Sequence, residues 1–143
     1  MEVKQLTQIT PEVVSVFGKL VPQLAENCPA PTAANLEKII RSDHTVVFIA
    51  IENSAIVGTL TLVIYRIMTG TKAWIEDVVV DNAVRGRGIG KLLTQHAIGY
   101  AARIGIGKID LTSSPSRIEA NALYQRIGFV KRETNVYRYE PGK

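Results

Sequence analysis

Residues 78–91 read Val-Val-Val-Asp-Asn-Ala-Val-Arg-Gly-Arg-Gly-Ile-Gly-Lys and are the most informative part of the chain. An aliphatic strand leads into a loop with three glycines at alternate positions, and an amphipathic helix follows at once. Glycine permits positive φ and close approach of the backbone to a ligand. The first turn of a helix has unpaired N–H groups and a partial positive charge, to which Arg85, Arg87 and Lys91 add full charges. The stretch therefore predicts a site for an anion such as phosphate or pyrophosphate.

Two common phosphate-binding loops do not fit these residues. A Walker A loop needs glycine where Arg85 stands and Ser or Thr where Leu92 stands. A dinucleotide fingerprint needs its third glycine where Lys91 stands. Asp110 does fall where a ribose-binding acid would, but only about 30 residues follow it, too few for the second half of a dinucleotide fold. A glycine-rich turn without a ligand is the remaining structural alternative.

The sequence before the loop predicts two helices and then three strands. Thr10, followed by Pro11, and Thr32 are the expected N-caps of the helices. Short β-branched or apolar runs at 45–51, 56–65 and 73–80 predict an antiparallel meander.

The sequence after the loop predicts alternating helices and strands. The helix that starts at Ile89 gives way to a strand at 108–112, and a capping box of Ser116 and Glu119 starts another helix that ends at Gly128. An extended segment is expected from 130 to 139. A meander followed by strand–helix–strand–helix–strand indicates an α/β fold in which a helix crosses between two parallel strands.

Length and composition set limits on the kind of protein. The 143 residues and 15.7 kDa fit one domain spanning 1–143, and the 46% hydrophobic and 21% charged fractions are those of a globular protein. Cys28 has no second cysteine for a disulfide or a metal site. No signal-peptide core and no apolar run of about 20 residues is present. We therefore expect a soluble cytoplasmic protein with no resident metal and no membrane partner.

The charge is unevenly distributed along the chain. Residues 1–80 have six Lys or Arg against eight Asp or Glu, whereas residues 81–143 have eleven against five. A basic half predicts an anionic partner, either nucleic acid or a phosphorylated cofactor. Few of the nine aromatic residues lie among the basic ones, so we expect no nucleic-acid partner.

The loop at 85–90, Arg-Gly-Arg-Gly-Ile-Gly, matches the Q/R-x-x-G-x-G/A loop of the GNAT superfamily of N-acetyltransferases. The resemblance runs from about 45 to 129 and includes the acidic-then-aliphatic strand at 76–80 and the helix end at 123–129, Leu-Tyr-Gln-Arg-Ile-Gly-Phe. It implies a mixed central sheet of about six to seven strands with helices on both faces. The final strand of such folds often pairs between subunits, which allows a homodimer.

The resemblance also implies acetyl-CoA as cosubstrate. The N–H groups of the loop would bind the pyrophosphate, and the backbone of the strand before it would pair with pantetheine like an added strand. Arg117 stands where the family often has asparagine, so it is expected to bind either a CoA phosphate or an acidic substrate. The residues expected to contact acetyl-CoA are Val78, Val79, Val80, Arg85, Gly86, Arg87, Gly88, Ile89, Gly90, Lys91, Arg117 and Asn121.

Tyr124 is the candidate acid that protonates the departing CoA thiolate. Arg117, Asn121 and Tyr124 are spaced i, i+4, i+7 beside an apolar stripe, so the tyrosine can bury its ring and direct its hydroxyl into a cleft. An ordinary tyrosine at the edge of the core is the alternative. The match to the family's tyrosine position favours the acid role.

Glu76 is the candidate base, acting on the acceptor amine through water. Strict alternation would put Trp74, Glu76, Val78 and Val80 on one face of their strand, and Ile75, Asp77 and Val79 on the other. Asp77, or water alone, is the rival base. A surface salt bridge at the end of the strand is the structural alternative for Glu76.

Together these residues predict direct transfer of an acetyl group from acetyl-CoA to a primary amine of a small molecule in a ternary complex. The strand at 75–81 resembles that of glucosamine-phosphate acetyltransferases, which makes a phosphorylated amino sugar one acceptor to test. Acetylation of a protein amino group and a catalytically idle acyl-CoA-binding module are the alternatives.

Overall fold

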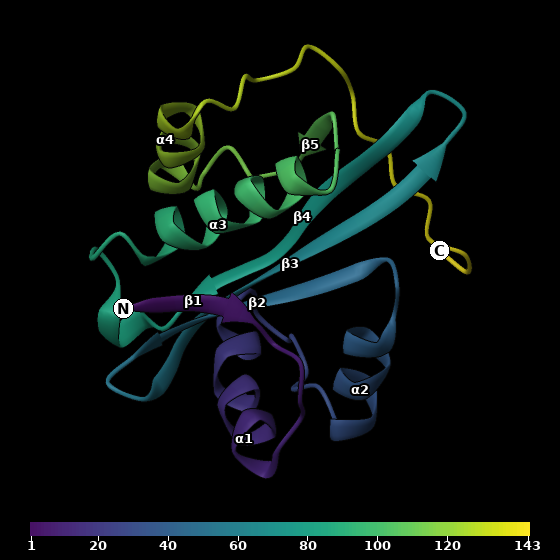
Figure 1. Cartoon of the computed structure of the whole chain (residues 1–143). Helices are drawn as coiled ribbons and strands as arrows, with labels where there is room; N and C mark the ends of the chain where they lie inside the picture. Colours follow the sequence, from purple (N-terminus) through teal and green to yellow (C-terminus); the bar gives the residue numbers. More distant parts are fainter. The chain divides into compact units, whose positions relative to one another are not determined.

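The computed structural model describes residues 1–143 as two compact units, Met1–Thr112 and Ser113–Lys143 (Figure 1). The first unit contains a five-stranded sheet in the order β1-β2-β3-β4-β5, in which only β5 runs parallel to its neighbour. The strands are β1 (Glu2–Gln5), β2 (Thr45–Glu52), β3 (Ala55–Ile67), β4 (Gly70–Val80) and β5 (Lys108–Asp110). The helices are α1 (Pro11–Leu20), η1 (Val21–Gln23), α2 (Ala33–Arg41), η2 (Asn82–Val84), α3 (Ile89–Arg103) and, in the second unit, α4 (Ile118–Ile127).

The two early helices begin where their N-caps predict. The Oγ1 of Thr10 accepts a hydrogen bond from the N–H of Val13 at 3.1 Å. At α2, the N–H of Asn35 donates to the Oγ1 of Thr32 at 3.1 Å and the N–H of Thr32 donates back to the Asn35 side chain at 3.4 Å. These bonds satisfy N–H groups that the first helical turn leaves without a backbone partner.

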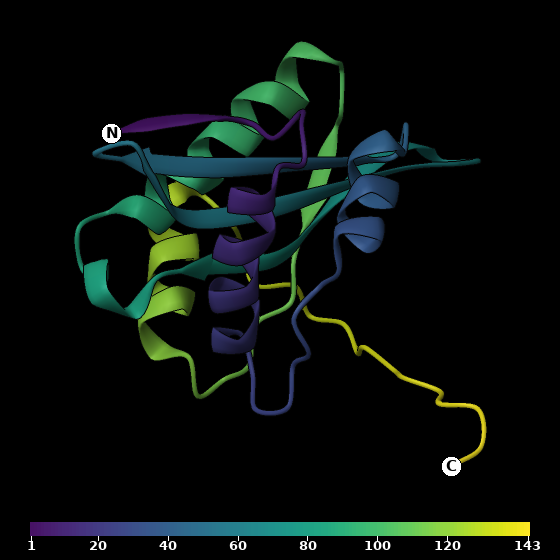
Figure 2. The ribbon, with the colours of Figure 1, turned by 90° about the horizontal axis from the view of Figure 1, so that it is seen from below.

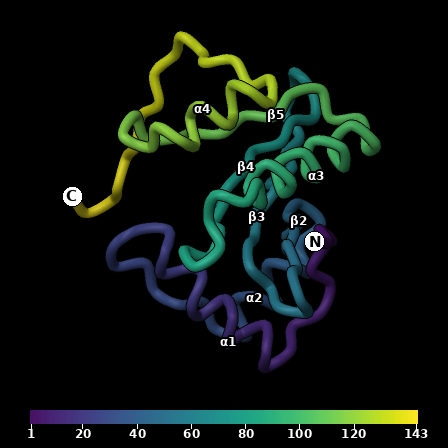
Figure 3. Tube along the Cα trace, turned by 90° about the vertical axis from the view of Figure 1, so that its left-hand side faces the viewer, coloured from purple at the N-terminus to yellow at the C-terminus, as the bar shows by residue number.

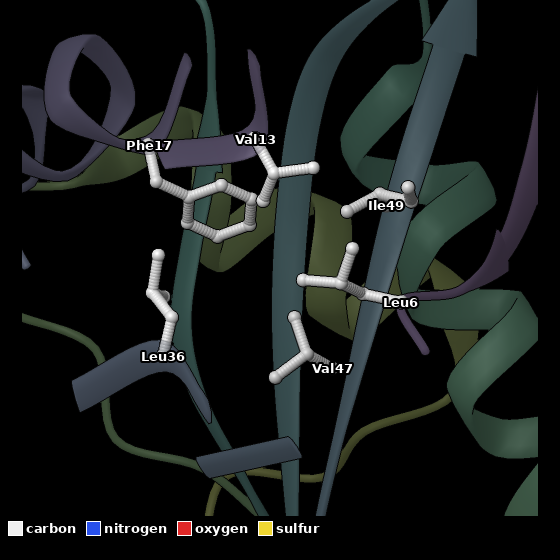
Figure 4. Packing of buried hydrophobic residues seen from close by; sticks show 6 residues of the cluster. All are labelled: Leu6, Val13, Phe17, Leu36, Val47 and Ile49. Atoms are coloured by element: carbon white, nitrogen blue, oxygen red, sulfur yellow. The ribbon is translucent and has the colours of Figure 1, made fainter. Parts of the chain in front are cut away.

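Helices cover both faces of the sheet in the first unit. Figures 1 and 3 show α3 on one side and α1 with α2 on the other, and Figure 2 looks from the side of α1 and α2. The core on the α1 and α2 side consists of Leu6, Val13, Phe17, Leu36, Val47 and Ile49 (Figure 4). Each such side chain, when fully buried, contributes about 1.5–3 kcal/mol, so these contacts fix both helices to β2. On the α3 side, the Phe48 ring lies edge-on to His96 and Tyr100 at 5.0 and 5.4 Å.

The α/β class with a mixed sheet is confirmed, but the expected number of strands is too high. The sheet has five strands instead of six to seven. The segment from Val130 to Tyr139, which was expected to be extended, forms no strand. The five residues that follow Val130 are all charged or polar, and all are exposed. Residues 131–135 have no apolar face to bury against a sheet. Conversely, β1 was not anticipated, because its four residues, Glu-Val-Lys-Gln, carry no strand signal.

The capping box expected at Ser116 and Glu119 is wrong. Helix α4 begins one residue later than expected, with Arg117 as its N-cap and no side-chain hydrogen bond there. The Asn121 side-chain amide instead donates to the Ser114 carbonyl at 3.0 Å, which ties the preceding turn to the helix. None of the helices in either unit has the length and apolarity that a membrane span requires.

Candidate active site

The glycine loop has the backbone conformation that an anion site needs. Gly86 and Gly88 have φ of +83° and +79°, in the left-handed region that favours glycine. Gly88 is the N-cap of α3, and its carbonyl accepts the N–H of Leu92 at 3.1 Å. Since this is the first intrahelical bond, the N–H groups of Ile89, Gly90 and Lys91 have no carbonyl partner within the helix. A Cβ added at Gly86 or Gly88 would meet nothing within 4 Å, so the space beside the loop is open.

The approach to the loop is anchored by three hydrogen bonds. The Asp81 N–H donates to the Val57 carbonyl at 2.8 Å, and the Asp81 carboxylate accepts from the Ala83 N–H at 3.1 Å. The Asn82 N–H donates to the Gln23 side chain at 2.9 Å. Gln23 in turn donates to the Lys19 carbonyl, so the end of α1 is connected to the loop. No motif indicates this role for Gln23, since its contact with Asn82 spans 59 residues of the chain.

The three cations of the loop differ in what they contact. One Arg87 guanidinium nitrogen lies 3.4 Å from both carboxylate oxygens of Glu52. The Arg85 side chain donates to the Val80 carbonyl at 3.4 Å, and Lys91 is exposed. With the Arg87 side chain 57% exposed, the pair with Glu52 is a weak surface interaction that an anion can compete with.

Strand β4 has a bulge between Glu76 and Val79. Glu76 pairs with Thr61 and Val79 with Thr59, so β4 has one more residue than β3 in this interval. Asp77 lies in the bulge with φ +50°, a conformation rare for a residue other than glycine.

The bulge overturns part of the expected alternation. Thr61 and Thr59 pair with Val47 and Ile49 of the core under α1 and α2, so Glu76 and Val79 share that face. Val80 pairs with Gly58 on the α3 face, next to Leu93. Trp74 and Glu76 do share a face as expected, but the placement of Val79 and Val80 is wrong because the extra residue shifts the alternation by one.

One edge of β4 is without a strand partner next to the bulge. Strand β5 pairs with β4 only from Lys72 to Trp74. From Ile75 to Val80, β4 is hydrogen-bonded into the sheet through β3 alone. The free edge includes Val78, Val79 and Val80 and can accept an extended ligand as an additional strand. Glu76 and Asp77, at its start, are both exposed.

The second unit brings together Arg117, Asn121 and Tyr124 on and beside α4. The Tyr124 ring lies edge-on to Phe129 at 5.8 Å, and the Phe129 N–H donates to the Tyr124 carbonyl at 2.9 Å. Burial raises the pKa of Tyr124 above its usual value of 10.0, an effect that the charge of Arg117 partly offsets. The phenol is therefore protonated at neutral pH and can act as a proton donor.

Comparisons with known proteins agree with this architecture. The model of the acetyltransferase (GNAT) family matches residues 14–129. A Bacillus subtilis protein named as an uncharacterised N-acetyltransferase, YhdJ, is 33% identical over 98 residues, which are 66% of this chain and 68% of that protein. A rice protein, "Probable glucosamine 6-phosphate N-acetyltransferase 2" of Oryza sativa subsp. japonica, is 30% identical over 135 residues, 86% of this chain and 79% of that one. A solved structure described as an acetyltransferase from Agrobacterium tumefaciens aligns with a TM-score of 0.86 at 26% identity, over 98% of this chain and 100% of that one.

Proposed function

Because the chain belongs to the GNAT family of acetyltransferases, we propose that it transfers the acetyl group of acetyl-CoA directly to a primary amine of a small molecule. The family match confirms the resemblance noted in the sequence, and the chain is an acyltransferase. The observation that carries the proposal is the loop geometry, in which two positive-φ glycines precede a helix N-terminus beside the free edge of β4.

The loop and the free edge of β4 fit acetyl-CoA in two ways. The unpaired N–H groups of Ile89, Gly90 and Lys91 suit the diphosphate, because oriented N–H donors at a helix N-terminus stabilise negative charge. The backbone of Val78, Val79 and Val80 suits the pantetheine arm, which carries amide groups that can pair with a strand edge. Arg85 and Arg87 add charge near the diphosphate, and Arg117 and Asn121 are proposed to contribute from α4.

The reaction needs a deprotonated amine and a stabilised leaving group. An alkyl ammonium with a pKa near 10 is almost fully charged at neutral pH, so a base must remove a proton before attack. We assign this step to Glu76, acting through water, because its exposed carboxylate lies at the start of the free edge. Acetyl-CoA supplies the activated acyl group and a thiol leaving group. The Tyr124 phenol, kept protonated by its raised pKa, is assigned to donate a proton to the departing sulfur.

The acceptor class is proposed from the site and from one relative. The rice protein that resembles this chain over most of its length is named for glucosamine 6-phosphate, a small amine. The exposed position of Glu76 is accessible to such a molecule. A protein amino group as acceptor, and an acyl-CoA-binding module without catalysis, are the two alternatives that the experiment must separate.

One assay tests the proposal. The protein is incubated with acetyl-CoA and a panel of hexosamines, aminoglycosides, amino acids and lysine peptides, while free CoA thiol is followed. We expect thiol release that depends on one of the small amines, with the acetylated amine found by mass spectrometry. Release with lysine peptides alone would favour protein acetylation. Acetyl-CoA binding with no thiol release above the protein-free control would favour the idle module.

A further inference from the structure

The sheet has an open face at its β3–β5 end. Reading across the strands, Tyr65 pairs with Lys72 and Lys72 pairs with Lys108. Two residues further along β4, Val63 pairs with Trp74 and Trp74 with Asp110. Paired residues point to the same side of a sheet, and i, i+2 residues share a face. Both sets of paired residues therefore lie on the same face of the sheet as Glu76, which pairs with Thr61.

Helices α1 and α2 do not bury this end of the face. Lys108 and Glu76 are exposed, and Tyr65, Lys72 and Trp74 are half-buried. By contrast, Val47 and Ile49 on the same face of β2 are only 4% and 3% exposed beneath the helices. The open end thus presents two aromatic rings and two ammonium groups around the strand that bears Glu76.

The two lysines are an unfavourable pair in the isolated sheet. Like charges directly across a ladder repel, and β5 is only three residues long. Asp110 lies on the same face, opposite Trp74, but forms no ion pair with either lysine. The ion pairs of the structure join other residues, namely Arg41 and Glu37, Arg87 and Glu52, and Lys143 and Glu140. Neither Lys72 nor Lys108 forms an ion pair with a carboxylate. An anion placed between them would remove the repulsion and gain two charge-assisted hydrogen bonds.

We propose that Lys72 and Lys108 bind a phosphate monoester on the acceptor amine. This inference rests on the proposed function and names the acceptor class for it. Lys72 and Glu76 are four residues apart on β4, about 13 Å between their Cα atoms at the rise of a strand. Because the lysine ammonium groups are carried on flexible four-carbon chains, they can reach towards Glu76, and a sugar phosphate can bridge the remaining distance. The half-buried Trp74 lies between the two positions and offers a flat surface to the ring of the acceptor.

Steady-state kinetics with matched acceptors tests the proposal. Glucosamine 6-phosphate and glucosamine are compared with the unaltered protein, Lys72→Gln, Lys108→Gln and Lys4→Gln. Lys4 is the control, because it is exposed on the same face of β1, at the opposite edge of the sheet. Lys72→Gln and Lys108→Gln should each raise the KM for the phosphorylated acceptor about 10- to 100-fold, while kcat stays within about two-fold. This pattern is expected because each variant loses a charge-assisted contact that is equally strong in the ground state and in the transition state. The KM for glucosamine, and all values for Lys4→Gln, should not change.

A binding measurement gives a readout that is independent of turnover. Glucosamine 6-phosphate should raise the melting temperature of the unaltered protein and of Lys4→Gln, and should do so much less for Lys72→Gln and Lys108→Gln. Equal KM values for both acceptors, a preference for amines bearing a carboxylate, or equal melting shifts in all four proteins would overturn the proposal. Absence of acetyl transfer to any amine would instead refute the proposed function, so the two failures are distinguishable.

Discussion

The glycine loop and the open sheet face both suit phosphate groups, but they do so with different chemistry. In the loop the donors are backbone N–H groups, oriented by the positive φ of Gly86 and Gly88 and by the start of α3. On the sheet face the donors are the side chains of Lys72 and Lys108, brought together by strand register. The loop should therefore respond to changes in backbone conformation and the face to changes in side-chain charge.

This difference matters for specificity. Backbone donors are present whatever the side chains are, so a loop of this kind can serve one constant cosubstrate. Side chains on a sheet face can be exchanged without refolding the strand, so the acceptor can differ between proteins that share the loop.

Gly88→Val should weaken acetyl-CoA binding and raise its Kd about 100-fold. A β-branched residue is strained at φ +79°, so the loop must change its conformation, although a Cβ itself would meet no atom within 4 Å. The Kd is measured by calorimetry. Gly99→Ala is the control, since this glycine lies inside α3 and a Cβ there makes only an ordinary 3.6 Å contact with Arg103. Unchanged affinity in Gly88→Val would remove the loop from the CoA site, whereas binding of glucosamine 6-phosphate should survive in this variant.

Glu76→Gln should lower kcat about 100-fold at neutral pH, because the amide cannot accept the proton of the ammonium. The deficit should shrink as the pH rises towards the pKa of the amine, where solvent supplies the free base. The pH dependence of kcat measures this recovery. Asp77→Asn, at the adjacent exposed carboxylate in the bulge, should have little effect. The reverse pattern would move the base to Asp77, and a constant deficit at every pH would exclude a base role for Glu76.

Tyr124→Phe should lower kcat about 10- to 100-fold and leave the Kd of acetyl-CoA unchanged, because a thiolate is already a fair leaving group. Burial raises the pKa of this phenol above 10.0, so the phenol should keep its proton up to pH 10. The kcat of the unaltered protein should therefore fall only above pH 10. The same shift adds stability below pH 10 that is lost as the pH rises through the raised value. Titration of kcat and of thermal stability checks both effects, and a variant with normal turnover would leave Tyr124 a packing residue against Phe129.

Glu52→Gln should tighten acetyl-CoA binding about two- to three-fold at low salt, because it releases Arg87 and removes a negative charge near the loop. The gain should fade at high ionic strength. Glu37→Gln breaks another surface pair, with Arg41 on α2, and should leave the Kd unchanged. Weaker binding in Glu52→Gln would mean that the carboxylate orients Arg87 towards its ligand.

The features predicted from sequence are those that depend on local backbone chemistry. Thr10 and Thr32 cap their helices, and the loop glycines adopt positive φ, since each requirement is met within a few residues. The α/β class followed from the order of strands and helices. The candidate role of Glu76 came from its place on the strand before the loop and that of Tyr124 from the family resemblance, and both remain predictions.

The features that were missed depend on distant partners. The bulge at Asp77 exists only relative to β3, so alternation along β4 could not reveal it. The contact of Gln23 with Asn82 and the pairing of Lys72 with Lys108 join residues that no motif connects. The extended segment expected at 130–139 has a suitable local pattern in its last residues but no partner strand.

A crystal structure of the protein with acetyl-CoA tests the central claim most directly. The diphosphate oxygens should lie about 2.7–3.2 Å from backbone nitrogens between residues 86 and 91, with the pantetheine arm along Val78 to Val80. A complex in which the diphosphate binds elsewhere and this loop contacts only solvent would contradict the account.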